Sequence, residues 1–238
     1  MAQSINSITT YMMKKLGPKV VVETAHRLGI TSELEAVPAL ALGTSDVSIM
    51  EMVGAFGTFV NKGEHITPFY IDRIEDKNGN ILHQFIPRKR PAMSEEHAYL
   101  MLYMLRGGTE ESGGTSQGVP WTLRDEGNEL GGKTGTTQNA SDGWYMAVTK
   151  DLVTGVWVGG DDRAIHFRSW ISGQGARTAR PIWSKFMEKV YNDPSTGITK
   201  GPFERPDRPL SVEIDCDMYD LERDNFGDFD YDSKNNDF

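Results

Sequence analysis

Apolar residues recur every three or four positions along several stretches of the chain, and this spacing predicts amphipathic helices. The first helix begins near Ser4, which we expect to cap it, and ends at Gly17-Pro18. Its expected buried face consists of Ile5, Ile8, Met12 and Leu16. A second helix opens at Pro18, because proline is favoured in a first helical turn, and ends at Gly29.

Three more helices carry start and stop signals of the same kind. Ser48 and Glu51 form a capping box, which predicts a helix that continues to about residue 60. Another is expected from Ser94 to Arg106, ending at Gly107-Gly108. The last covers about residues 179–191, and its expected apolar face is Ile182, Phe186 and Val190.

Extended segments lie between these helices. Residues 69–75 and 81–85 flank an Asn-Gly turn at 78–79, which is a strong hairpin signal. Residues 144–149 and 153–159 are rich in aromatic and β-branched side chains and predict a second hairpin. Helices and strands in separate blocks indicate an α+β fold with a largely antiparallel β-sheet flanked by helices.

Charge divides the chain into two parts. The net charge of the 238 residues is −9, and residues 202–238 alone hold 12 acidic and 4 basic side chains. We therefore expect a globular part at 1–200 and an acidic, disordered tail at 201–238. The globular part is nearly neutral, which excludes a nucleic-acid binder, because phosphate contacts need a basic face. Apolar runs are short and the first residues lack a basic-then-apolar leader, so we expect neither a membrane span nor a signal peptide.

Possible metal sites are weakly signalled. Asp228, Asp230 and Asp232 alternate as in a calcium loop, but Ser233 stands where such a loop needs glycine. The single Cys216 and the scattered histidines lack the spacing of a metal site. We expect no metal.

Residues 127–137 match two incompatible motifs. Gly127, Gly132, Lys133 and Thr134 fit the phosphate-binding P-loop pattern, which requires a preceding buried strand and a following helix. The charged residues before it and the helix-poor residues after it argue against a nucleotide site.

The other motif is Lys133-Thr134-Gly135, the K-T-G element of serine acyltransferases that act on D-Ala-D-Ala peptides and β-lactams. In an edge strand Thr134 and Thr136 share one face, where their hydroxyls bind a substrate carboxylate, while Lys133 points elsewhere and supplies positive charge. Gly135 allows a ligand to approach the backbone. The N–H of Thr136 is a candidate oxyanion-hole donor.

A second element of those enzymes, S-x-N, is matched by Ser4-Ile5-Asn6. In this reading the Ser4 hydroxyl relays a proton to the leaving group, and the Asn6 amide binds the substrate peptide. The alternative is that Ser4 is only a helix cap.

The sequence resembles bifunctional class A penicillin-binding proteins from residue 2 to about residue 191. The resemblance rests on S-x-N, K-T-G and the segments between and after them, in the order of that family: Ala39–Ser48, Phe69–Leu82, Gly132–Thr137, Asp142–Tyr145, Val156–Gly159 and Asp161-Asp162.

This resemblance implies a penicillin-binding, serine β-lactamase-like fold and a peptidoglycan D,D-transpeptidase without cofactors. Its implied partners are stem peptides of peptidoglycan and β-lactam antibiotics, and its implied place is a membrane-anchored enzyme facing the periplasm or cell exterior. Ser4 and Lys133 are then catalytic, and Asn6, Thr134, Gly135 and Thr136 bind substrate.

One element of that family is missing. Its nucleophile lies in S-x-x-K, where the lysine activates the serine one helical turn away, and no lysine here has a serine three positions before it. We therefore expect the fold to be incomplete at its N-terminus, with the missing N-terminal portion of the domain as a partner. Acyl transfer by this chain alone is then not expected. The alternative is a non-catalytic module that binds peptides or β-lactams.

Overall fold

The computed structural model describes residues 1–125 and 127–214. The chain divides into two units, Met1–Arg205 and Pro206–Phe238, and every helix and strand described here belongs to the first. The helices are α1 (Asn6–Leu16), α2 (Pro18–Arg27), α3 (Ile49–Val60), α4 (Glu95–Glu110), α5 (Trp170–Gly173) and α6 (Ala179–Asn192). The strands are β1 (Glu64–Ile66), β2 (Arg73–Glu75), β3 (Ile81–Gln84), β4 (Lys89–Pro91), β5 (Gly131–Thr136), β6 (Asp142–Val148) and β7 (Val153–Gly159). Short 3₁₀ turns occur at Pro38–Leu42, Trp121–Leu123, Gln138–Ala140 and Pro194–Thr196.

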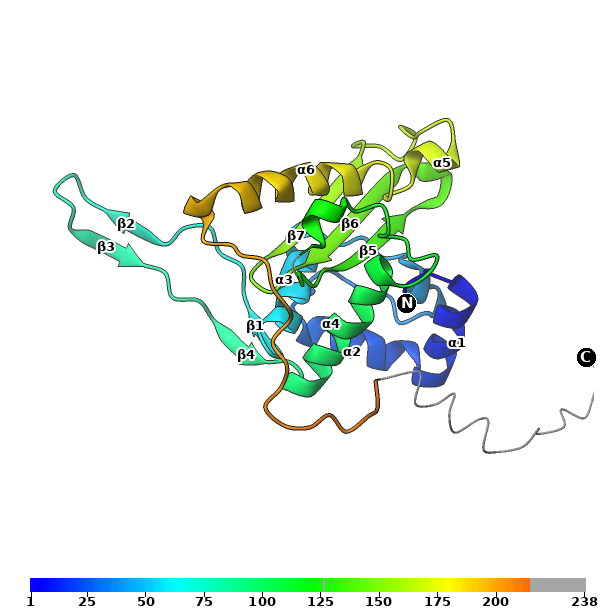
Figure 1. Ribbon diagram of the computed structural model, residues 1–238, viewed down its shortest axis with the longest axis horizontal. Helices are drawn as coiled ribbons and strands as arrows, with labels where there is room; N and C mark the ends of the chain where they lie inside the picture. The colour runs from blue at the N-terminus through cyan, green and yellow to red at the C-terminus, as the bar shows by residue number, and fades with distance from the viewer. Residues whose placement is uncertain (126, 215–238) are drawn as a thin grey trace, which may run out of the picture. The chain divides into compact units, whose positions relative to one another are not determined.

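The main sheet has the order β5-β6-β7, with both pairs antiparallel (Figure 1). Among the described residues, β5 pairs with β6 alone and is therefore an edge strand. β1 and β4 form one small antiparallel pair, and β2 and β3 form another. The α+β class and both predicted hairpins are confirmed. No described helix is long and apolar enough to cross a bilayer.

The core lies between the main sheet and α6. Tyr145 of β6 stacks edge-on against Trp183 of α6, with ring centroids 5.3 Å apart. The predicted apolar face of this last helix is wrong in part: Val190 is buried, but Ile182 and Phe186 are exposed. The face that meets the sheet is instead Ala179, Trp183, Met187 and Val190.

α4 continues past its predicted end, and the glycine at position 108 lies against strand β5. Gly107 and Gly108 lie inside the helix, which runs to Glu110. A Cβ atom on Gly108 would lie 2.5 Å from the carbonyl oxygen of Gly132. The glycine therefore brings α4 against β5 rather than ending the helix.

α1 exposes most of its apolar side chains. Met13 is the buried residue of α1, and α2 has none among its ten residues. The face that periodicity predicted to be buried is exposed, with Ile8 56% and Leu16 55% accessible. α1 is amphipathic as predicted, but the side that packs against the rest of the unit is the one that carries Met13.

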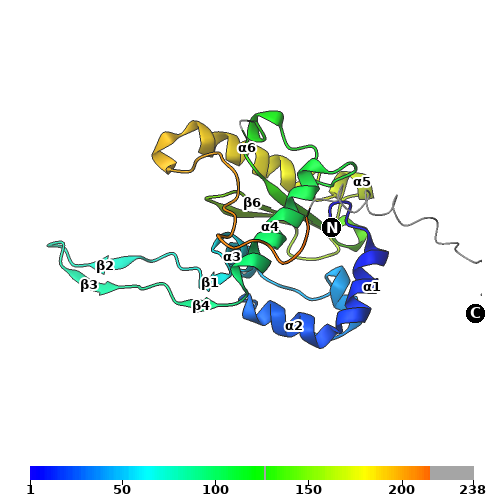
Figure 2. The same cartoon turned by 60° about the horizontal axis from the view of Figure 1, so that its bottom comes forward.

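The hairpin β2–β3 projects from the rest of this unit (Figures 1 and 2). Its turn is fixed by the carboxylate of Asp76, which accepts hydrogen bonds from the backbone N–H groups of Asn78 and Asn80 at 2.7 and 2.9 Å. These hydrogen bonds and that from the Asn80 amide lower the pKa of Asp76.

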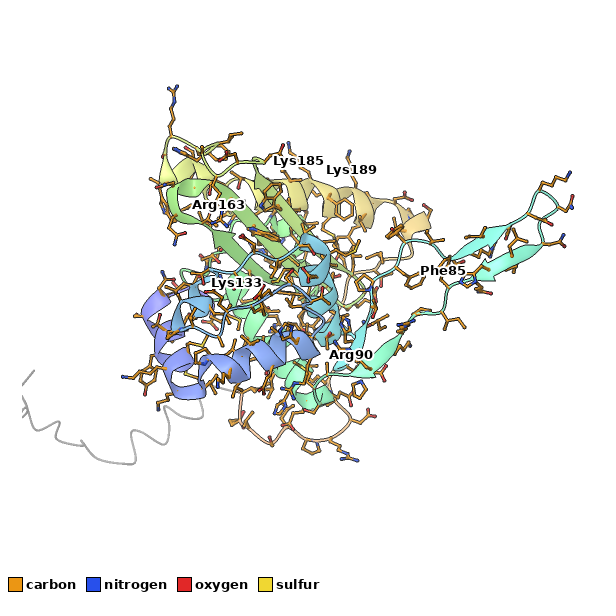
Figure 3. All side chains as sticks on the ribbon, turned by 180° about the vertical axis from the view of Figure 1, so that it is seen from behind. Phe85, Arg90, Lys133, Arg163, Lys185 and Lys189 are labelled. Atoms are coloured by element: carbon orange, nitrogen blue, oxygen red, sulfur yellow. The ribbon has the colours of Figure 1, made fainter. Side chains whose placement is uncertain are left out.

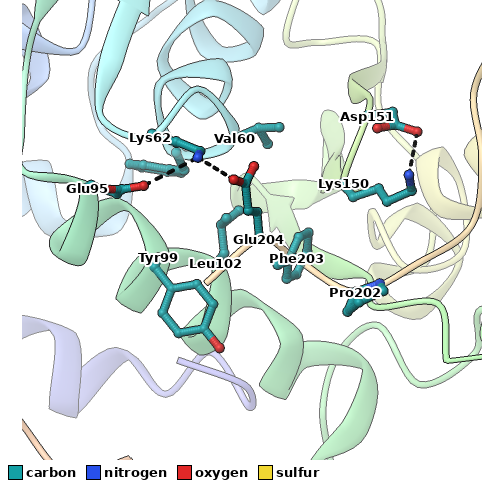
Figure 4. A pocket seen from close by; sticks show the side chains of 11 residues that line it. Val60, Lys62, Glu95, Tyr99, Leu102, Lys150, Asp151, Pro202, Phe203 and Glu204 are labelled. Carbon is teal, nitrogen blue, oxygen red and sulfur yellow. Dashed lines mark hydrogen bonds and ion pairs between the residues drawn. The ribbon is translucent and has the colours of Figure 1, made fainter. Parts of the chain in front are cut away.

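Residues 201–204, which we assigned to the acidic tail, pack on the body. Phe203 is only 4% exposed and its N–H donates to the Glu129 carboxylate at 2.7 Å. Figure 4 shows the side chain of Lys62 between Glu95 and Glu204, with which it forms ion pairs. These contacts surround a pocket of ≈240 Å³. The division at residue 200 and the disorder of the tail stay predictions, and Asp228, Asp230 and Asp232 lie outside the described residues.

Glu51 joins three segments at the start of α3. The predicted capping box with Ser48 is present. The Glu51 carboxylate also accepts hydrogen bonds from the backbone N–H groups of Thr31 and Ser32, both at 2.7 Å. Burial opposes its ionisation, but the hydrogen bonds from Ser48, Thr31 and Ser32 outweigh burial and lower the pKa of Glu51 well below 4.5.

Replacing Glu51 with Gln is therefore expected to reduce the free energy of unfolding by about 1–2 kcal/mol at neutral pH. Because the folded-state pKa is lowered, the carboxylate stabilises the protein above pH 4.5, and this contribution is lost as the pH falls toward the lowered value. Denaturant unfolding at several pH values measures both effects. Glu23→Gln, on the exposed side of α2, is the control. An equal loss at pH 3 and pH 7 would contradict the assignment.

Candidate active site

Strand β5 presents the K-T-G residues on two faces of the sheet. Lys133 pairs with Met146, and Thr134 pairs with Tyr145. Tyr145 belongs to the core under α6, so Thr134 and Thr136 lie on the α6 face and Lys133 lies on the opposite, α3 face. This alternation is the one that the sequence predicted.

Lys133 is bound to Ser4. Its ammonium donates to Ser4 Oγ at 2.7 Å and to the carbonyl oxygen of Thr134 at 2.7 Å. The ion pairs of the described residues do not include Lys133. Burial, uncompensated by a carboxylate, lowers the pKa of this lysine.

Ser4 is positioned by the segment before it, because Ala2 and Gln3 form hydrogen bonds with residues 112–115. The N-cap of α1 is Ile5, without a side-chain hydrogen bond, so the interpretation of Ser4 as a cap is wrong. The carbonyl of Ala2 accepts the N–H of Thr115 at 3.1 Å. Ser4 itself has a φ of 54°, a conformation that costs a residue with a Cβ some free energy and that accompanies the contact of its hydroxyl with Lys133.

A cleft of ≈590 Å³ runs along β5 on the α3 side. K-T-G contributes to its wall through Lys133, Thr134, Gly135 and Thr136. Its apolar lining includes Ile49, Met52, Phe56, Trp144, Met146 and Trp157. Lys133 and Arg163 are labelled in Figure 3, and Arg163 forms an ion pair with Asp46 at the cleft. Asn6 is exposed at the start of α1 and is outside this lining.

The structure also decides the P-loop hypothesis. Gly132, Lys133 and Thr134 lie inside strand β5, not in a loop before a helix, so the P-loop interpretation is wrong. Within residues 1–125 and 127–214, no group of three His, Cys, Asp or Glu side chains is arranged to hold a metal ion.

Sequence reasoning missed several residues at the site. Thr136 Oγ1 accepts the N–H of Gly175 at 3.2 Å, and Trp157 Nε1 donates to Asp142 at 2.8 Å. Trp144 and Trp157, which lie in the predicted second hairpin, line the cleft. No local pattern identifies Gly175, because its role depends on contacts with strands far away in the sequence.

The Lys133–Ser4 bond predicts how that lysine titrates. Since Ser4 accepts a hydrogen bond from the ammonium and so favours the charged form, Ser4→Ala is expected to lower the pKa of Lys133 further. NMR titration of lysines labelled at Cε measures this, with Lys133→Arg assigning the signal. In the wild type, stability is expected to rise with pH between the lowered pKa and 10.5, because the unfolded chain binds the proton more tightly. An unchanged titration in S4A would show that the two side chains are not coupled.

Comparison with known proteins agrees with this geometry. Residues 1–165 match the family described as the penicillin-binding protein transpeptidase domain. Penicillin-binding protein 1A of Aquifex aeolicus is 32% identical over 214 residues, which cover 90% of this chain and 28% of that protein. The crystal structure of penicillin-binding protein 1A from Haemophilus influenzae superposes with a TM-score of 0.72 at 27% identity, covering 89% of this chain and 35% of the other.

A third likeness concerns the fold alone. The structure of PonA1 from Mycobacterium tuberculosis in complex with penicillin V has a TM-score of 0.67 at 22% identity, and the match covers 85% of this chain and 57% of that one. The chain spans about three-tenths of the length of its curated relative from Aquifex. The predicted penicillin-binding fold is confirmed, and the chain belongs to the penicillin-binding protein transpeptidase domain family.

Proposed function

We propose that this chain forms the substrate-binding part of a serine-type D,D-transpeptidase that cross-links peptidoglycan. The observation that carries the proposal is the bond between Ser4 and Lys133, the first residues of S-x-N and K-T-G, beside a cleft that K-T-G lines. It joins two motifs of the family in the arrangement that their chemistry needs.

The strand is suited to bind the carboxylate end of a D-Ala-D-Ala stem peptide. Thr134 and Thr136 offer hydroxyl groups on one face of the edge strand, and Lys133 adds positive charge from the other. Gly135 has no side chain to obstruct a peptide that lies along β5. The N–H of Thr136 is then a donor for the oxyanion of the attacked carbonyl.

Ser4 and Lys133 are suited to carry a proton. In the proposed reaction the serine of S-x-x-K gives its hydroxyl proton to the lysine of that motif, and its oxygen attacks the penultimate D-Ala carbonyl. The C–N bond then breaks, and the nitrogen of the departing D-Ala takes up a proton. The lowered pKa of Lys133 favours giving up its proton to Ser4 Oγ, which passes its own proton to that nitrogen. The acyl group then passes to an amine of a second stem peptide.

The attacking serine belongs to a segment that we place against the exposed surfaces of this chain. None of the lysines in the sequence follows a serine by three positions. The exposed apolar face of α1 follows Ser4 in the sequence. The apolar lining of the cleft adjoins Lys133 in space. We infer that a segment bearing S-x-x-K covers them and completes the domain.

Binding of a ligand with a free carboxylate tests the recognition step. An acyl-D-Ala-D-Ala peptide is expected to bind the chain reversibly, and Thr134→Val or Thr136→Val to weaken binding roughly three- to tenfold each, as a lost hydrogen bond does. Isothermal titration calorimetry measures the affinity. The same peptide with a C-terminal amide is the control and is expected to bind weakly. Equal affinity for acid and amide would contradict carboxylate recognition at this strand.

Acylation tests the assignment of the nucleophile. The chain alone is expected to form no covalent adduct with penicillin, measured by intact-protein mass spectrometry. An adduct is expected on the serine of a separately expressed S-x-x-K segment from a class A relative when the two are mixed, and to disappear when that serine is replaced by alanine.

A covalent adduct on this chain by itself would overturn the proposed division of the active site. Reversible binding of peptide, with no adduct in the mixture either, would favour the non-catalytic binding module.

A further inference from the structure

The turn between α5 and α6 reaches the end of the K-T-G strand. The buried Gly175 donates its backbone N–H to Thr136 Oγ1 at 3.2 Å. These two residues are 39 positions apart. The contact therefore connects the turn before α6 to one hydroxyl of the K-T-G strand, on its α6 face.

The contact depends on the absence of side chains. A Cβ atom on Gly175 would lie 2.3 Å from the carbonyl oxygen of Trp144 and 2.6 Å from that of Gly135. On the facing strand, a Cβ on Gly143 would lie 2.2 Å from Thr178 Oγ1. Only glycine at both positions lets the turn lie this close to β5 and β6.

The turn is also fixed internally. The carbonyl of Gln174 accepts the N–H groups of Arg177 and Thr178 at 2.7 and 3.0 Å. The carbonyl of Gly175 accepts those of Ala179 and Arg180 at 3.1 and 2.9 Å. The N–H of Gly175 is thus presented by a rigid turn at the beginning of α6, not by a loose loop.

The direction of this hydrogen bond determines what Thr136 offers a ligand. A hydroxyl has one hydrogen to donate and two lone pairs to accept. Because Gly175 occupies a lone pair of Thr136 Oγ1, the hydrogen is directed away from the turn. We propose that Gly175 is a positioning residue that makes Thr136 a donor for the carboxylate of the bound peptide. This inference rests on the proposed function.

Thr134 provides an internal comparison. It lies two residues earlier in β5 and on the same face, but no hydrogen bond to its hydroxyl is found among the described residues. The hydroxyl of Thr134 is therefore free to rotate, whereas that of Thr136 is fixed. Gly175 is expected to act on ligand binding through Thr136 alone.

A double-mutant cycle on binding of the acyl-D-Ala-D-Ala peptide tests this. Gly175→Ala forces the turn away from β5 and is expected to weaken binding roughly three- to tenfold in the wild type and in T134V. In T136V it is expected to cause no further loss. Gly57→Ala is the matched control, since its Cβ would meet only Asn61 at 3.9 Å, and is expected to leave binding unchanged. An equal loss in T134V and T136V would overturn the proposal.

Hydrogen exchange gives a second test that does not require G175A to fold. The Gly175 amide is expected to exchange faster in T136V than in the wild type, and to keep its protection in T136S, which retains the acceptor oxygen. Unchanged exchange in T136V would also overturn the proposal. If T136V weakens peptide binding but G175A does not, only this inference fails. If neither T134V nor T136V weakens binding, the proposed function itself fails.

Discussion

The hydrogen bond between Lys133 and Ser4 joins two motifs that are 129 positions apart. It requires a lysine that is buried without a carboxylate partner, which lowers its pKa, and a serine held with a φ of 54°. Both features cost stability on their own. The rest of the unit compensates for them, since α4 and β6 hold β5 in place and the 112–115 loop holds residues 2–4.

Local signals in the sequence were sufficient for the elements around this bond. The capping box at Ser48, the Asn-Gly turn and the alternation in β5 each depend on neighbouring residues, and the structure contains all three. The K-T-G and S-x-N motifs were found because their residues are close in sequence. Their contact with each other was not predicted, because no local pattern reports a distance across 129 residues.

The errors have a common physical origin. Periodicity identifies an apolar face but not what covers it, so Ile8, Ile182 and Phe186 were expected to be buried and are exposed. The pair Gly107-Gly108 was taken as a helix end, whereas Gly108 allows a close contact with β5. Ser4 had two interpretations, a helix cap and the serine of S-x-N. A serine just before a helix fits both until the first residue of the helix is known.

These exposed faces are consistent with a domain whose active site is shared between segments. A surface of Ile5, Ile8, Met12 and Leu16, which adjoins Ser4 in the sequence, is costly to leave in water, and burying it provides free energy for docking. In the proposed function, that free energy is available where the attacking serine docks. Recognition of the substrate and recruitment of that serine are, on this proposal, tasks of adjoining surfaces, with Ser4 and Lys133 between them. On the same proposal, Gly175 contributes to recognition through Thr136 and takes no part in docking of the serine.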